Sequence, residues 1–261
     1  MSEKFPSNPN VDLPVSEDVP LAYLEQGEEY PRALYQFDTP DLQDRYVVRS
    51  MGFDDPAAYD QLPLTEQYAA YDEELRSLQD AGVNVPRTYT TTPEGFENIV
   101  PESPTDRKFP DVMVVTEKID PVDMSVVDPN VIRQQAQAHI EGLIHYLQKS
   151  HDPNTAGSTP YYMGDVFKPT EVLYGQPHTG GEPGFYMIDT GGLMHRSDIE
   201  SDFGDDLANI MATGVQLSRM TGDPSVEAYT MDRLGMTEEQ ADAAVRSYYY
   251  STENPDFEDY A

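Results

Sequence analysis

Apolar residues recur every three or four positions in several stretches of the chain, the spacing that predicts amphipathic helices. One stretch begins after Thr65, a possible N-cap, and ends before Gly82. Another begins at Asp128-Pro129, where aspartate can cap a helix and proline suits its first turn. On this basis we expect helices over residues 65–81, over 128–147, over 205–220, and from Thr237, where Thr-Glu-Glu-Gln matches a capping box.

Other segments alternate apolar and polar residues or are rich in β-branched and aromatic ones, as strands are. Strands are expected over 33–53 (a hairpin or sheet edge), 83–90, 111–119, 171–175 and 184–189. Strands with one helix come first and mostly helices follow, which predicts an α+β fold with two lobes. The expected parts are an extended N-terminal tail over 1–22, a small β-rich lobe with one helix over 23–118, and a larger, mainly helical lobe over 119–261 that ends in a C-terminal helix and an acidic tail.

The chain is strongly acidic, with 48 Asp and Glu against 16 Lys and Arg and a formal net charge of -32. Such a surface repels phosphate backbones and anionic membranes, because both are bound through lysine and arginine. No apolar run approaches the roughly 20 residues that span a bilayer. The chain has no cysteine, which excludes disulfides, thiol nucleophiles and cysteine-ligated metals. We therefore expect neither nucleic-acid binding nor membrane insertion.

The same acidity predicts a salt-rich setting. Self-repulsion at this charge destabilises a compact chain at low ionic strength, whereas molar salt shortens the Debye length to about 3 Å and screens it. The sequence is therefore interpreted as that of a protein from the cytoplasm of a halophilic archaeon, or from the particle of a virus that infects one. An ordinary acidic protein is the alternative.

Two aspartates flank the predicted hairpin over 171–189. Asp165 precedes it in a loop after Gly164, and Asp189 leaves its second strand just before Gly191. That arrangement can bring two carboxylates to one point, where one could orient a hydroxyl nucleophile and the other could hold Mg²⁺ on a nucleotide. Each aspartate could equally cap a glycine-containing turn.

The pair and its surroundings resemble the catalytic and metal-binding loops of the protein-kinase-like superfamily, in the style of aminoglycoside phosphotransferases and RIO-type kinases. The segments that carry the resemblance are Tyr46-Val47-Val48-Arg49, Glu73 to Arg87, Val114 to Ile119, Tyr162 to Tyr174 and Phe185 to Gly191. Together they lie within residues 23–220. The resemblance implies a bilobal kinase-like fold with an ATP site between the lobes.

The resemblance also implies a role for each matching position, with Mg-ATP as the cofactor if the protein is active. Asp165 would be the catalytic base and Asp189 a metal ligand. The asparagine that normally helps bind metal falls on Thr170 or Glu171, and Glu171 would be the second metal ligand. Arg49 stands where the ATP-binding lysine is expected, and Lys168 could contact a phosphate or simply be a surface cation.

Several positions depart from the family pattern. Met163 replaces the histidine of His-Gly-Asp, and residues 25–35 hold one glycine where a glycine-rich loop is expected. The glutamate that normally pairs with the lysine falls on Tyr71 by strict spacing, and Glu73 or Glu74 would serve only after a shift along the helix. Arginine cannot act as a compact ammonium charge between phosphates.

Two functions follow from these observations. The first is a kinase-fold protein with an eroded ATP site and no cofactor, which acts as a binding or assembly component, for example as a structural subunit of a haloarchaeal tailed virus. The second is an active Mg-ATP-dependent phosphotransferase acting on a hydroxyl of a small molecule or protein. The first predicts protein partners bound through residues 1–22 and the segment around Tyr248-Tyr249-Tyr250, although these tyrosines could also pack the C-terminal helix.

Overall fold

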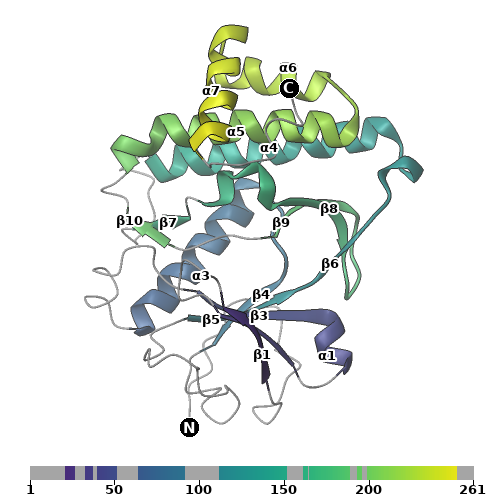
Figure 1. Cartoon of the computed structure of the whole chain (residues 1–261), viewed down its shortest axis with the longest axis vertical. Coiled ribbons are helices and arrows are strands. Elements are labelled where there is room, and N and C mark those ends of the chain that lie inside the picture. The colour runs from purple at the N-terminus through teal and green to yellow at the C-terminus, as the bar shows by residue number, and fades with distance from the viewer. Residues whose placement is uncertain are drawn as a thin grey trace.

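A β-sheet forms one end of the molecule and a group of helices the other, with a long helix and a hairpin between them (Figure 1). The expected class, α+β with a small β-rich lobe and a larger, mainly helical lobe, is confirmed. The arrangement is consistent with the kinase-like fold that the resemblance implies. The computed structural model describes residues 21–26, 33–37, 40–51, 64–91, 112–151, 161–163, 165–188, 193–195 and 199–251.

The small lobe is a five-stranded antiparallel sheet with one long helix. The short helix α1 (Pro40–Arg45) lies between the second and third strands in the chain, and α3 (Leu64–Ala81) lies between the third and fourth. Val48 and Val115 pair across the middle of the sheet, and both are fully buried. The strands, in the sheet order β1-β2-β3-β5-β4, are β1 (Leu21–Gln26), β2 (Ala33–Phe37), β3 (Tyr46–Met51), β5 (Val112–Glu117) and β4 (Thr88–Thr91).

Four helices build most of the described part of the larger lobe. In Figure 1, α4 and α5 lie side by side, and α6 and α7 pack on α5 at the end of the molecule that is far from the sheet. Gly222 and Gly235 end α5 and α6 with a φ of 66° each, a left-handed conformation that costs glycine little. The helices are α4 (Pro129–His151), α5 (Ile199–Thr221), α6 (Ser225–Leu234) and α7 (Glu238–Ser251).

Short strands and turns lie between the helices and the sheet. A three-stranded sheet contains the predicted hairpin, and its order is β6-β8-β9. A separate pair joins β7 to β10. The strands are β6 (Ile119–Pro121), β7 (Tyr161–Met163), β8 (Val172–Pro177), β9 (Gly184–Met187) and β10 (Leu193–His195), and the 3-10 turns are η2 (Met124–Val126), η3 (Asp165–Phe167) and η4 (Pro169–Glu171).

The long helix α4 begins as its sequence predicts and packs against both lobes. The Asp128 carboxylate accepts a hydrogen bond from the Asn130 amide at 2.8 Å, and Pro129 is the first helical residue. Where α4 passes the end of α3, the two backbones touch at Gly142. A β-carbon there would lie 2.9 Å from the carbonyl carbon of Gly82, so only glycine fits.

The last helix, α7, is capped by the predicted capping box. The Thr237 amide donates to the Gln240 side-chain oxygen at 2.9 Å, and the Gln240 amide donates to the Thr237 hydroxyl at 3.3 Å. Near the other end of α7, Tyr248 is buried and packs with Ala212 of α5. One tyrosine of the triplet therefore packs the C-terminal helix, as one of the two sequence interpretations predicts.

Some expected boundaries shift. Strand β1 begins at Leu21, inside the segment predicted as a tail, and residues 1–20 lie outside the described residues. The strand expected over 83–90 is reduced to β4, because the chain before it passes over α4 and contains Pro86, which cannot donate a ladder hydrogen bond. Helix α5 begins at Ile199 instead of 205, and the sequence did not predict α6. The lobe boundary between 118 and 119 stays a prediction.

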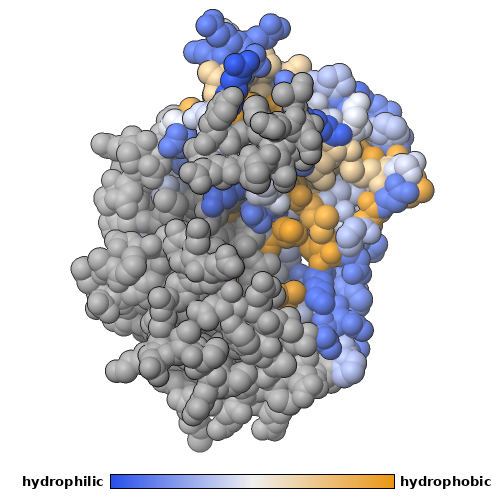
Figure 2. Space-filling model, viewed as in Figure 1, coloured by the Kyte–Doolittle hydropathy of each residue, from blue (hydrophilic) through white to orange (hydrophobic). Residues whose placement is uncertain are grey.

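The described surface is mixed in polarity. Within the described ranges, no helix combines the length and the apolar character needed to cross a membrane. Figure 2 shows hydrophobic residues gathered on one part of the described surface, bordered by hydrophilic ones. The large hydrophobic residues that are exposed include Val126, in η2, and Val131, in the first turn of α4.

Candidate functional site

The turn that carries Asp165 is anchored by two helices of the large lobe. Asp165 begins η3, and the next two residues, Val166 and Phe167, are fully buried. The Thr213 hydroxyl on α5 donates to the Phe167 carbonyl at 3.0 Å, and the Phe167 ring lies 5.9 Å from that of Tyr146 on α4, between centroids. These contacts hold the end of the turn that Asp165 begins, whereas the Asp165 carboxylate lies outside the described side chains.

A buried chain of hydrogen bonds links this turn to the small lobe. Met163, in β7, is fully buried, and its amide donates to the Tyr146 hydroxyl at 2.8 Å. The same hydroxyl donates to the Glu74 carboxylate at 2.7 Å. Glu74 belongs to α3 and is 1% exposed. Helices α3 and α4 and strand β7 therefore meet at one hydroxyl group, which acts as both donor and acceptor.

Glu74 is a buried acidic residue of α3 that contacts the large lobe. Strict spacing assigns the position of the lysine-pairing glutamate to Tyr71, but Tyr71 packs in the apolar core. Glu74 lies on the same helix stripe as Tyr71, Leu75 and Leu78, all buried. A glutamate inside an otherwise apolar stripe is the signal that could have identified it, because a buried carboxylate needs hydrogen-bond partners.

Lys168 and Glu171 flank the second turn of the same loop. Lys168 is the N-cap of η4, and both residues are half-buried. The Glu171 carboxylate accepts a hydrogen bond from the Thr170 hydroxyl at 3.1 Å. Its backbone carbonyl accepts one from the Ile188 amide at 2.8 Å. The structure therefore places Asp165, Lys168 and Glu171 on one connected pair of turns.

Asp189 lies outside the described residues, so its distance from Asp165 stays a prediction. The described residues on either side of it are placed. Ile188 is bonded to the loop as above, and Leu193 pairs with Met163 in the β7–β10 ladder. The two described ends that flank 189–192 therefore both lie against the loop that carries Asp165.

Arg49 lies within the sheet of the small lobe. Its backbone pairs with Leu34 of β2 on one side and with Val114 of β5 on the other. The side chain lies outside the described side chains, so its contact with a phosphate stays a prediction.

The fit of a metal ion can be judged from the donors in this region. Among the residues that the structure describes, no three His, Asp or Glu side chains gather in a way that could hold a metal. Of the two predicted ligands, Glu171 offers a half-buried carboxylate beside the turn, and Asp189 lies outside the described residues. Carboxylate oxygens are of the donor type that Mg²⁺ prefers. The donor chemistry fits, and the coordination stays a prediction.

A second buried carboxylate ties the lobes together where β5 ends. The Glu117 side chain is fully buried, and one of its oxygens accepts hydrogen bonds from both the amide (2.8 Å) and the hydroxyl of Thr179, in the β8–β9 turn. The Arg87 Nε lies 3.8 Å from the other oxygen, and its Nη1 donates to the Thr179 hydroxyl at 3.3 Å. The hairpin turn of the large lobe thus closes on the last residue of the small-lobe sheet.

The chain that connects the lobes is held by the same hairpin. Strand β6 pairs with β8 along Gly175–Pro177. The His178 amide donates to the Lys118 carbonyl at 3.0 Å, and the His178 ring lies 2.8 Å from the Asp120 carboxylate. The connection between the lobes is therefore a strand of a sheet.

His139, on α4, is a packed histidine. It is 3% exposed, and neither ring nitrogen has a hydrogen-bond partner within the described part of the chain. Burial lowers its pKa from 6.5 to about 4, because the charged ring would lose its hydration. The ring is therefore neutral near neutral pH.

Comparisons with known proteins identify no family. No protein-family model matches the chain, and no curated protein matches it. Two crystal structures of the Mycobacterium tuberculosis PknI kinase domain, a double and a single mutant, are similar in overall structure. The double mutant is 14% identical, with 90% of this chain and 99% of that chain covered and a TM-score of 0.37. The single mutant is 13% identical, with 87% and 95% covered and a TM-score of 0.35.

Proposed function

We propose that this protein is a kinase-like protein with an eroded ATP site that serves as a binding or assembly component. The observation that carries the proposal is at Met163. The position that the resemblance gives to a histidine holds a thioether, which is fully buried and whose backbone is fixed by Tyr146. A buried methionine has neither a charge nor a strong hydrogen-bonding group to offer to a reaction.

The positions that would handle phosphate support the same proposal. Arg49 replaces a compact ammonium group, and residues 25–35 contain one glycine where the phosphate-cradling loop is expected. Phosphoryl transfer depends almost entirely on charge neutralisation and positioning. A net charge of -32 also disfavours the approach of an anionic nucleotide.

An active Mg-ATP-dependent phosphotransferase is the second candidate. It is favoured by the contact that anchors the η3 turn at Phe167 and by the buried Glu74 at the lobe boundary, because catalysis needs groups held in position. In this case Asp165 would orient the acceptor hydroxyl, Asp189 and Glu171 would hold Mg²⁺, and Arg49 or Lys168 would contact phosphates.

Calorimetric titration with Mg-ATP in molar KCl separates the two candidates. The wild-type chain, Asp189→Asn and the control Asp205→Asn, an exposed aspartate on α5, are compared. The first proposal expects no saturable binding at millimolar nucleotide in any of the three. Saturable binding that is lost in Asp189→Asn and kept in Asp205→Asn would establish the second candidate instead.

The proposed partner surfaces are residues 1–22 and the segment around Tyr248-Tyr249-Tyr250. Because Tyr248 is packed against Ala212, the contact would use its neighbours in this segment. Light scattering in molar KCl on the full chain and on a chain lacking residues 1–20 is the test. We expect an assembly that the truncation weakens. A full chain that stays monomeric at every concentration contradicts an assembly role.

We also propose that the protein works in a salt-rich cytoplasm or in a virion exposed to one. The reason is the net charge of -32, whose self-repulsion salt screens. Urea unfolding should show a free energy of unfolding that rises as KCl increases from about 0.1 M to about 2 M. A free energy that is independent of KCl would leave an ordinary acidic protein as the better interpretation.

A further inference from the structure

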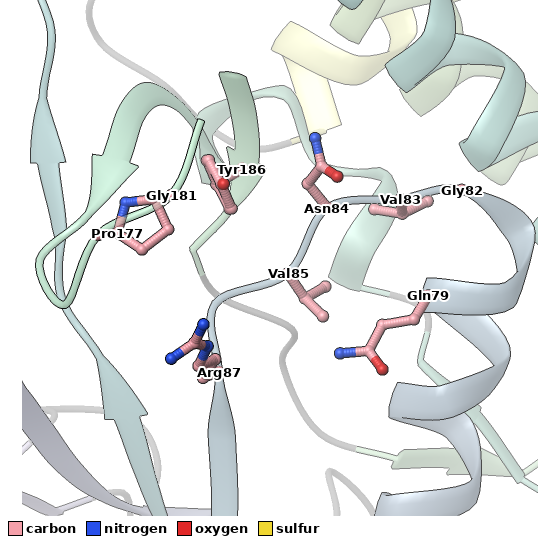
Figure 3. Close-up of a pocket in the computed structure, with 10 residues that line it drawn as sticks. Gln79, Gly82, Val83, Asn84, Val85, Arg87, Pro177, Gly181 and Tyr186 are labelled. Carbon is pink, nitrogen blue, oxygen red and sulfur yellow. The ribbon is translucent and has the colours of Figure 1, made fainter. Parts of the chain in front are cut away.

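The described residues line a cavity that neither proposed function uses. Its volume is about 340 Å³, within the range of small-molecule sites. One wall is the end of α3 with the segment that follows it, and the other is the β8–β9 hairpin (Figure 3). None of the predicted catalytic or metal-binding residues lines it. Its lining includes Gln79, Val85, Arg87, Pro177, Gly181 and Tyr186.

Arg87 supplies the charge of this cavity. Its side chain is 51% exposed and extends toward the hairpin (Figure 3). The contacts with Thr179 and Glu117 hold the guanidinium in place but use only part of its N–H donors, and the other donors have no hydrogen-bond partner within the described ranges. An arginine that is fixed before binding loses little entropy on binding and can grip a carboxylate or phosphate with two donors.

Apolar groups and two side-chain amides complete the lining, and one of these amides, Asn84, donates to the Phe185 carbonyl at 3.2 Å. Val85 and Pro177 offer aliphatic surface. The Tyr186 hydroxyl donates to the Glu182 carbonyl at 3.2 Å, which leaves the ring as its contribution to the cavity. In Figure 3 the Gln79 amide extends into the space between α3 and Arg87. The cavity therefore combines a cationic end, an apolar wall and the amide of Gln79 as a hydrogen-bonding group that extends into it.

We propose that this cavity binds a small organic anion, with a carboxylate or phosphate head at Arg87 and a flat apolar body against Val85, Pro177 and Tyr186. Buried Glu117 already balances part of the guanidinium charge, and the net charge of -32 opposes the approach of anions, so the expected affinity is modest, with a Kd of about 1 mM. An occupant would touch both lobes and restrain their relative orientation. The inference does not depend on whether ATP binds elsewhere.

Ligand-observed NMR on the full chain in molar KCl tests the proposal. The probes are benzoate and phenyl phosphate, which separate the two head groups, and benzyl alcohol, their neutral counterpart. We expect saturable binding of at least one anion at millimolar concentration, and at least tenfold weaker binding of benzyl alcohol. Absence of saturable binding by both anions, or equal binding of the alcohol, overturns the proposal.

Three variants locate the bound probe. Arg87→Gln removes the charge and should weaken anion binding at least tenfold. Gln79→Trp fills the cavity from an exposed helical position and leaves the residues Glu117 and Thr179 unchanged. It should also weaken anion binding at least tenfold. The control Arg76→Gln removes an exposed arginine from the same helix, outside the cavity, and should change nothing. Binding that survives Gln79→Trp, or that falls equally in Arg76→Gln, shows that the anion binds elsewhere and contradicts the proposal.

Discussion

Two buried glutamates of the small lobe each meet a hydroxyl of the large lobe, yet the two contacts are built differently. Glu74 meets Tyr146, a fully buried ring in α4 that also holds the amide of β7. Glu117 meets Thr179, which lies on an exposed turn beside the half-exposed Arg87. The first contact is inside the apolar core, and the second is at its edge.

This difference determines how much stability the protein loses when each contact is removed. In the core no water replaces a lost partner, so the loss of one hydrogen bond by a buried polar group is not compensated. At the hairpin turn water can reach Thr179 and Arg87 and replace part of what is lost. We therefore expect the lobes to loosen first at the hairpin turn, while the Tyr146 contact persists until the large lobe unfolds.

Tyr146→Phe is expected to have the largest effect. The change removes the hydroxyl between Glu74 and the Met163 amide, so two buried groups lose this partner at once. We expect the free energy of unfolding to fall by about 4 kcal/mol, measured by urea titration in molar KCl.

Tyr174→Phe is the matched control for this change. The Tyr174 hydroxyl donates to the neutral side chain of Gln135 at 3.2 Å in a partly buried position. Its loss should cost about 1 kcal/mol. Equal losses for the two tyrosines would show that the core contact has no special weight.

The pH dependence due to His139 is expected to be the next largest effect. It tests whether water is excluded from the His139 side chain, which lies on α4 seven residues before Tyr146. Burial holds the pKa of His139 at about 4 in the folded chain, below its ordinary 6.5. The unfolded chain therefore binds the proton first, so stability is full above about pH 6.5 and falls as the pH drops toward 4. At about 1.4 kcal/mol per pH unit, the loss by pH 4 is roughly 3 kcal/mol.

His139→Leu isolates this contribution from the carboxylates, which also titrate in acid. Urea titrations of both chains between pH 7 and pH 4 give the difference in stability. The wild-type chain should lose more stability than the variant over this window. Parallel curves for the two chains would mean that the imidazole is hydrated in the folded state.

Thr179→Val should have a smaller effect at the other contact. The valine keeps the volume but removes the hydroxyl bonds to Glu117 and Arg87, while the backbone amide still donates to Glu117. We expect a loss of about 1 kcal/mol by urea titration. Thr170→Val removes an exposed hydroxyl that contacts only its neighbour Glu171 among the bonds described, and should cost less. If Thr179→Val lost as much stability as Tyr146→Phe, the predicted difference between the core contact and the edge contact would be wrong.

The smallest effect is expected at a third glutamate, Glu141, whose partner lies in the same lobe. Hydrogen bonding by Arg233 holds the pKa of Glu141 below its usual value. Its contribution is therefore present above the unfolded pKa and is lost as the pH falls through the folded one. Arg233→Gln should lower the urea midpoint less than Thr179→Val, and less again as KCl rises, because the pair is exposed. A larger or salt-independent change would contradict this ranking.

Local signals predicted α4, α5 and α7 of the large lobe, but not α6. The caps at Asp128 and Thr237 act within three residues along the chain, so the pattern is readable from sequence. Strands β7 and β10 have only three residues each, too few to show alternation, and they pair across a long separation. The sequence therefore does not predict them.

In the candidate site too, the sequence predicts groupings of residues that are close in the chain but not contacts between distant ones. Asp165, Lys168 and Glu171 are close in the chain, so a shared loop could be predicted. The contacts between the lobes join residues 72 apart for Glu74 and Tyr146, and 62 apart for Glu117 and Thr179. Glu74 can be recognised in the sequence as an acidic residue within an apolar helix stripe. Glu117 ends a strand, where an acidic residue normally faces water. Only the tertiary structure shows why it is buried.

The strand that connects the lobes has a consequence for dissecting this protein. Because Ile119–Pro121 are hydrogen-bonded to β8, the segment is not a loose tether that a protease could cut without disturbing a sheet. A fragment ending at residue 118 would contain Glu117 without its hydrogen-bond partner Thr179, and the complementary fragment would contain Thr179 without Glu117. The two halves are therefore best regarded as one cooperative body, to be expressed and mutated together.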